Sequence, residues 1–147
     1  MNISPNAPVA AESRTEIDAN PDTVWDLLVH VERWPDWNPE VKSASLEGGI
    51  REGSVFRWKT VTGTITSTLQ AIDRPRSLAW TGRMMTIKTM HVWTLEPQNV
   101  KTVVTSAASF EGAVASVLRL PLQKLLQKVL RDELATLKQE AERRASG

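Results

Sequence analysis

The feature that most constrains the fold is a change in the spacing of apolar residues near residue 113. Before it, apolar residues recur at every second position in successive short runs, as Phe56 and Trp58 do. Alternation of this kind is typical of half-buried strands. From 113 to about 144 the spacing becomes three and four, as in an amphipathic helix. One sheet and one long helix can bury their apolar faces together only if the sheet curls around the helix, which predicts an α+β fold.

Local signals divide the N-terminal part. Residues 9–19 alternate loosely and are predicted to form the first strand. Asn20 can cap a helix, and Pro21 supplies a preset φ at the first helical position, so a short helix is predicted to begin there. The segment 34–39, Trp-Pro-Asp-Trp-Asn-Pro, is too short and stiff for a full helix and is predicted to form a single helical turn or 3₁₀ piece.

Two further signals concern connections. Residues 61–63, Val-Thr-Gly, are predicted to form a tight connection between two strands. Pro121 lies inside the long helical pattern and is expected to kink it, or to divide it into a short first turn and a main helix.

Size and composition exclude several classes of protein. With 147 residues we expect a flexible tail over 1–8 and a single domain over 9–145. A net charge of +1 gives no overall field that would favour nucleic acid. The absence of cysteine excludes thiol catalysis and disulfides, and two histidines are too few for a histidine-rich zinc site. We therefore predict no metal and no cofactor.

The same sequence gives no sign of membrane insertion or export. No apolar run approaches the roughly 20 residues that cross a bilayer. The first eight residues are polar and proline-broken, without the apolar core of a signal peptide. A cytoplasmic location is the resulting expectation.

An ordered set of short motifs runs through about residues 9 to 140. It comprises Pro21-Asp22-Thr23-Val24-Trp25, the turn 34–39, Gly53 with Phe56 and Trp58, Pro75 with Leu78 and Trp80, the run 91–95, and Thr102 ahead of Phe110-Glu111-Gly112. With these motifs the chain resembles the START-like or SRPBCC superfamily, which has a Bet v 1-like helix-grip fold, and within it the bacterial polyketide cyclase/dehydrase-like group. The resemblance implies a curved antiparallel sheet of about six to seven strands around a long C-terminal helix, short helices after the first strand, and a ligand cavity.

Strand parity and the helix pattern together predict which residues would line such a cavity. The candidate ligand-binding residues are Phe56, Trp58, Leu69, Trp80, Met84, His91, Trp93, Thr102, Leu122 and Leu126. Tryptophans offer flat apolar walls with single N–H donors, which suits a rigid polycyclic or acyl ligand, although plain filling of the core would use the same residues.

His91 is the one candidate for catalysis. It is the only ionisable residue that the strand pattern places on the inward face, beside Trp93 and Leu95, and an imidazole near neutral pH can move a proton. The alternative is a histidine hydrogen-bonded to a neighbouring group. Ala107 and Ala108 stand where relatives often carry an acidic residue, and the chain has no tyrosine. Both observations favour binding over catalysis.

The first hypothesis is therefore a carrier or binder of a small hydrophobic molecule, such as a lipid or polycyclic metabolite, acting as a monomer or homodimer. The alternatives are a cyclase or dehydratase-type enzyme that uses His91, and a protein-interaction module with a filled core. Transient contact with an anionic membrane is a further hypothesis, carried by four basic residues on the long helix. A solvated helix face is the competing interpretation, because four acidic residues follow; the two sets are Arg119, Lys124, Lys128 and Arg131, and Asp132, Glu133, Glu140 and Glu142.

Overall fold

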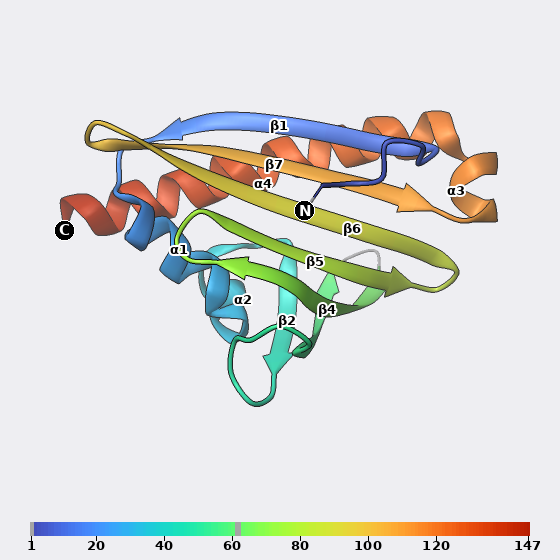
Figure 1. Cartoon of the computed structure of the whole chain (residues 1–147), viewed down its shortest axis with the longest axis horizontal. Coiled ribbons are helices and arrows are strands. Elements are labelled where there is room, and N and C mark those ends of the chain that lie inside the picture. Colours follow the sequence, from blue (N-terminus) through green and yellow to red (C-terminus); the bar gives the residue numbers. More distant parts are fainter. Residues whose placement is uncertain (1, 61–62) are drawn as a thin grey trace.

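The computed structural model describes residues 2–60 and 63–147. A seven-stranded antiparallel sheet, in the order β1-β7-β6-β5-β4-β3-β2, curves beside one long C-terminal helix (Figure 1). The elements are β1 (Val9–Ile17), α1 (Pro21–Val29), η1 (Val31–Arg33), α2 (Trp34–Trp37), β2 (Val41–Leu46), β3 (Val55–Thr60), β4 (Gly63–Asp73), β5 (Ser77–Met84), β6 (Ile87–Gln98), β7 (Lys101–Glu111), α3 (Ala113–Val117) and α4 (Arg119–Ser146). This is the helix-grip fold with short helices after the first strand, and the predicted fold class is confirmed.

The predicted local signals near the N-terminus are present. The side chain of Asn20 accepts a hydrogen bond from the backbone N–H of Thr23 at 2.9 Å, and α1 begins at Pro21. The tryptophan segment forms the 3₁₀ turn η1 and the single turn α2. In the predicted tight connection at 61–63, Val61 and Thr62 lie outside the described residues; Gly63 begins β4 with φ of 134°, a backbone conformation that favours glycine.

The long helical pattern is divided into a short helix and a main helix, which is one of the two alternatives predicted from Pro121. The chain leaves helical geometry at Leu118, which has φ −99° and ψ 27°, and this residue separates α3 from α4. Pro121 lies in the first turn of α4, where its missing N–H removes no helical hydrogen bond. The 28-residue α4 then continues without a second break.

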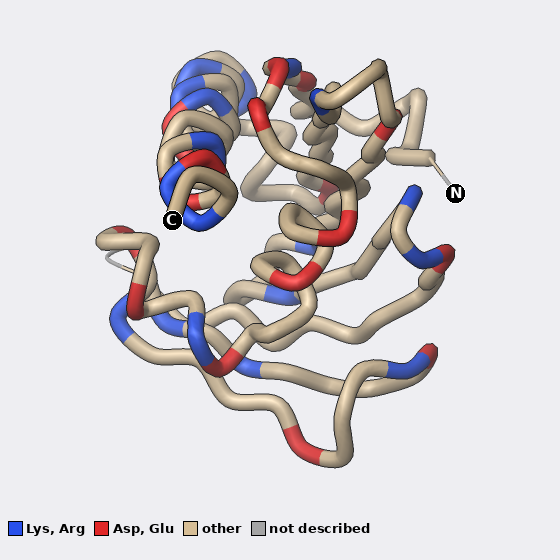
Figure 2. The backbone as a smooth tube through the Cα atoms, turned by 90° about the vertical axis from the view of Figure 1, so that its left-hand side faces the viewer, with Lys and Arg blue, Asp and Glu red and all other residues tan. Residues whose placement is uncertain are grey.

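Side chains of α4 fasten the helix to the edge strand β1. Gln123 accepts from the N–H of Ala10 at 3.1 Å and donates back to its carbonyl. Further along the helix, Gln127 donates to the carbonyl of Glu12, Lys138 donates to that of Glu16, and Glu142 accepts from the N–H of Asp18. These bonds satisfy backbone groups that an edge strand would otherwise leave open. They also hold α4 along β1, at one side of the curved sheet (Figure 2).

The apolar interior falls into two clusters. The larger one joins α1, the tryptophan turns, the inner faces of β3 to β6 and the C-terminal half of α4, through Leu134, Leu137 and Ala141. The smaller one lies under the N-terminal half of α4, where Leu126 and Leu130 pack on β1 and β7. Because α4 follows β1, tryptophans from α2 cover much of the inner face of β3 to β5. In the described part of the chain, no helix is long and apolar enough to span a membrane.

Candidate functional site

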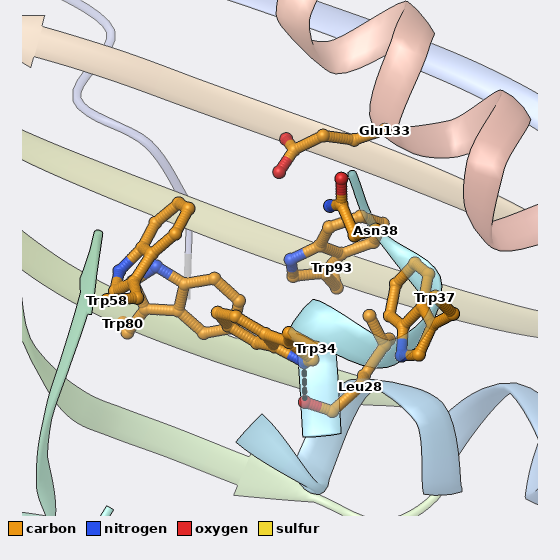
Figure 3. Close-up of a pocket in the computed structure, with 8 residues that line it drawn as sticks. All are labelled: Leu28, Trp34, Trp37, Asn38, Trp58, Trp80, Trp93 and Glu133. Carbon is orange, nitrogen blue, oxygen red and sulfur yellow. Dashed lines mark hydrogen bonds between the residues drawn. The ribbon is translucent and has the colours of Figure 1, made fainter. Parts of the chain in front are cut away.

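A pocket of about 320 Å³, including its open mouth, lies where the tryptophan turns meet the sheet and α4 (Figure 3). It is formed by α1, α2 and the residue that follows it, strands β3, β5 and β6, and the middle of α4. The residues that line it are Leu28, Trp34, Trp37, Asn38, Trp58, Trp80, Trp93 and Glu133. Five of these eight are tryptophans, so the walls are flat, apolar and rich in aromatic surface.

Trp34 holds the aromatic walls in place. Its ring meets Trp58 edge to face at 5.4 Å between centroids, and it lies 5.7 Å from Trp80 at a tilt of 41°. Its indole N–H donates to the carbonyl of Leu28 at 3.2 Å, which ties the wall to α1. Trp58 donates to the hydroxyl of Ser67 at 3.1 Å. Both indoles therefore have fixed orientations before any ligand arrives.

Two other indoles of the pocket have no partner for their N–H groups. The Nε1 atoms of Trp37 and Trp93 are buried and lack a hydrogen-bond acceptor among the described residues. A buried donor without an acceptor costs free energy, and native proteins rarely keep one without a reason. In Figure 3 the Nε1 of Trp93 lies on the side of Glu133, whereas that of Trp37 lies on the other side of the wall, toward α1. Each marks a place where an acceptor atom of a ligand or a water molecule belongs.

Glu133 brings a carboxyl group to the same pocket from α4. Figure 3 shows the carboxyl directed from the helix toward the side where Asn38 and Trp93 lie. Burial raises the pKa of Glu133 to about 7, and the nearby charge of Glu40 contributes in the same direction. Within residues 2–60 and 63–147, Glu133 makes neither a hydrogen bond nor an ion pair. The site thus holds an unpartnered carboxyl that titrates near neutral pH.

This finding corrects one sequence-based expectation, because Glu133 does not belong to a solvated helix face. It also adds an ionisable residue that faces the interior from the helix, beside His91 on a strand. The helix pattern carried a signal for Glu133, which follows Leu126 by seven residues and Leu130 by three, so it lies on the same side of the helix as the buried leucines. An acid at a core-facing helix position is therefore the sequence signal for this pocket residue.

His91 is buried outside the pocket lining, in the arrangement of the hydrogen-bonded alternative. Its Nε2 lies 2.6 Å from the hydroxyl of Ser106, and its ring stacks on Trp93 at 4.9 Å between centroids. Burial lowers its pKa to about 3, so the imidazole is neutral across the physiological range. Both features favour the hydrogen-bonded alternative over proton transfer near neutral pH. The visible role of the histidine is to pack behind Trp93.

The other predicted ligand-binding residues separate into groups. Trp58, Trp80 and Trp93 line the pocket. Phe56 and Leu69 belong to the larger apolar cluster behind it, with Phe56 in edge contact with Trp34 and Trp80.

The remaining four predicted residues lie elsewhere. Thr102 donates to the carbonyl of Ala19 at 2.7 Å and is fully buried. Leu122 and Leu126 pack in the smaller cluster, and Met84 ends β5 opposite Ile87. None of the four lines the pocket in the described structure.

Five pocket residues were not among the predicted ligand-binding set: Leu28, Trp34, Trp37, Asn38 and Glu133. Trp34, Trp37 and Asn38 belong to the segment predicted to form a single helical turn, and the structure places them on the pocket wall. Asn38 also has a structural role, because its side-chain oxygen accepts from the N–H of Glu40 at 3.0 Å.

A second cleft lies on the outer side of Trp37. It encloses about 380 Å³ including open space, and its walls come from α1, α2 and the end of α4: Asp26, Leu27, His30, Arg33, Trp37 and Arg144. His30 bonds within α1 to the carbonyl of Asp26, and Arg144 pairs with Glu140. In the described part of the chain, no group of three or more His, Asp or Glu side chains could hold a metal ion.

The sequence matches the family described as polyketide cyclase / dehydrase and lipid transport over residues 8–142. No curated protein sequence matches the chain. Among solved structures, a hypothetical protein from Helicobacter pylori is similar with a TM-score of 0.84 and 12% identity, over 95% of this chain and 91% of that one.

Two further structures share the fold. A START superfamily protein from Mycobacterium smegmatis has a TM-score of 0.77 and 16% identity, over 91% of this chain and 97% of that one. The Zhui aromatase/cyclase from Streptomyces sp. R1128 has a TM-score of 0.77 and 19% identity, over 92% and 94%. At these identities the likeness concerns the fold.

Proposed function

The chain belongs to the polyketide cyclase/dehydrase and lipid-transport family of the START superfamily, and from this premise we propose that it binds a small, largely apolar molecule in the tryptophan pocket. The observation that carries the proposal is the pair of buried indole N–H groups of Trp37 and Trp93 without acceptors. A core that serves only for stability would gain from pairing or removing them.

The chemistry of the walls supports an aromatic or compact apolar ligand. Flat indoles give contact area with little loss of side-chain entropy, and Trp34 and Trp58 are already fixed by hydrogen bonds. Burial of apolar ligand surface contributes roughly 25 cal/mol per Å². The pocket volume includes open solvent, and the space that a water-sized molecule can occupy is about 20 Å³, room for about one water. This is far below the usual range for ligand sites, about 300–1,000 Å³, so any ligand larger than water needs movement of a wall.

Glu133 favours a second candidate, an enzyme of the cyclase or dehydratase type. A carboxyl with a pKa near 7 can accept a proton and return it, which is what general acid–base catalysis requires. If the ligand is also a substrate, Glu133→Gln should abolish its turnover and leave the unreacted substrate bound. In a protein that only binds, the substitution would alter affinity alone.

The test of the proposed function is a titration with N-phenylnaphthylamine, an uncharged probe that accepts excitation energy from tryptophan. We expect saturable energy transfer in the native protein. Glu133→Phe places a bulky ring at the pocket wall. It should weaken the affinity for the probe at least about tenfold, because the probe can no longer bury an aromatic ring there.

The matched control is Ala135→Phe, an equal-sized ring at an exposed position of the same helix. It should titrate like the native protein. Equal binding by both variants, or no saturable transfer in the native protein, would contradict a ligand site in this pocket and favour an interaction module with a filled core. We also propose a cytoplasmic location and a monomeric or homodimeric state.

A further inference from the structure

We propose that the tryptophan pocket opens to recognise a small organic ammonium ion such as choline, held by the carboxylate of Glu133 against the indole walls, with an oxygen atom that accepts from Trp93. This inference rests on the proposed function, because it names the class of ligand for the same pocket. Three observations carry it: an unpartnered carboxyl, a wall of indoles without a basic residue, and a buried unpaired N–H.

The carboxyl of Glu133 has no cation of its own. The pocket lining of the described structure contains no Lys, Arg or His. On the same helix Lys128 is paired with Asp132, and no basic residue in the described part of the chain contributes to the pKa of Glu133. Glu133 is therefore a negative site whose counter-charge must come from outside the chain.

The electrostatic surroundings favour a cation over a neutral donor. Glu40, at the start of the segment that follows α2, adds a second negative charge that acts on Glu133. His91 is neutral and paired with Ser106, so it adds no positive charge behind the wall. A cation is attracted by these two negative charges. It also offsets the free-energy cost of burying a carboxylate without a partner.

The aromatic walls add a second attraction. The faces of indole rings carry negative charge density, and tryptophan is the best partner for an ammonium ion. Removing water from a substituted ammonium ion costs less free energy than removing it from a metal ion or simple ammonium. Such an ion can therefore enter a pocket that is walled by five indoles. Carboxylate and indole faces together form a site for an organic cation with apolar substituents.

The remaining part of the ligand follows from Trp93. Its indole N–H is a donor, and a positive charge placed at that edge would be repelled. An oxygen atom next to the ammonium group, as in an amino alcohol, satisfies Trp93 while the ammonium group stays near Glu133 (Figure 3). The class that fits is an amino alcohol, or an ether or ester of one.

A pair of probes with the same shape tests the charge. Choline and neohexanol both carry a hydroxyl on a two-carbon chain, and a carbon atom replaces the nitrogen in neohexanol. Each is titrated at constant ionic strength and near pH 8.5, while the indole N–H resonances are followed by nitrogen-edited NMR. We expect choline to bind about tenfold or more tightly than neohexanol. The resonance of Trp93 should move, and that of Trp25, which lies outside the pocket, should not.

Glu133→Gln provides the decisive variant, because it keeps the shape of the side chain and removes its charge. We expect the preference for choline to fall to about twofold or less. Equal binding of both probes by the native protein would overturn the inference. So would an unchanged preference in the variant, or a native protein that binds N-phenylnaphthylamine but neither probe. In that last case the proposed function is supported, but the inference that the ligand is a cation is wrong. If no probe of any kind binds, the proposed function is wrong as well.

Discussion

The replacement of Glu133 by Gln is the perturbation with the most direct physical consequence for stability. Burial raises the pKa of Glu133 from 4.5 to about 7 in the folded chain. The folded state therefore holds a proton that the unfolded state has already released between these two values. The stability that protonated Glu133 contributes is fully present below pH 4.5 and is lost as the pH rises through 7.

The magnitude follows from the difference of the two values. At about 1.4 kcal/mol per pH unit, a difference of about 2.5 pH units corresponds to about 3 kcal/mol. Glu133 is only partly buried, so screening by solvent reduces this value. We expect that the native protein loses about 1–3 kcal/mol relative to Glu133→Gln between pH 4.5 and pH 8.5.

The assay is urea unfolding of both proteins, followed by tryptophan emission at several pH values. His91, whose pKa is lowered, contributes stability that is lost as the pH falls below 6.5, and this contribution is the same in both proteins and cancels in the difference. The control Glu52→Gln removes the same charge at an exposed position. A difference between native protein and Glu133→Gln that stays constant with pH would refute the burial of this carboxyl.

Three other substitutions test the structural roles assigned above. His91→Ala should lower the free energy of unfolding by about 2–4 kcal/mol in urea titrations, because it opens a cavity and leaves Ser106 unpaired; a loss under about 1 kcal/mol would argue against the buried contact. Thr102→Val keeps the shape but leaves the carbonyl of Ala19 unpaired, with an expected loss of about 1–2 kcal/mol by the same method, and no loss would speak against that bond. Asn20→Ala removes the cap of α1 and should cost about 1 kcal/mol in thermal unfolding; an unchanged midpoint would contradict the cap.

The fold was predictable because its signals are local. Alternation of apolar residues defines each strand without reference to distant parts of the chain, and the cap at Asn20 fixes where α1 begins. Pro121 also carried a local signal, since a proline in a helical pattern either kinks the helix or lies in its first turn. The exact break at Leu118 was not predictable, because that residue has no special backbone preference.

The site was predicted only in part, because its position depends on where α4 lies. Strand parity correctly placed Trp93 on the inner face, but parity does not say which stretch of that face the helix leaves open. Gln123 and Gln127 bond to the backbone of β1 and draw α4 to the edge of the sheet. Long-range polar contacts of this kind leave no periodic trace in the sequence.

The same geometry explains why Leu126, inward on the helix, does not reach the pocket, whereas Glu133 does. Leu126 packs on β1 and β7, and Glu133, two turns further along, lies where α2 replaces the helix as the cover of the sheet. A helix pattern gives the angular position of each residue but not the partner it meets.

The measurement that tests the central claim most directly is native mass spectrometry of the freshly purified protein and of Glu133→Phe. Each is examined alone and after incubation with a panel of compact apolar compounds and amino alcohols. The account predicts a small-molecule adduct on the native protein that denaturation releases and that Glu133→Phe lacks. An unshifted mass for the native protein under every condition, or the same adduct on both proteins, would contradict a ligand site in the tryptophan pocket.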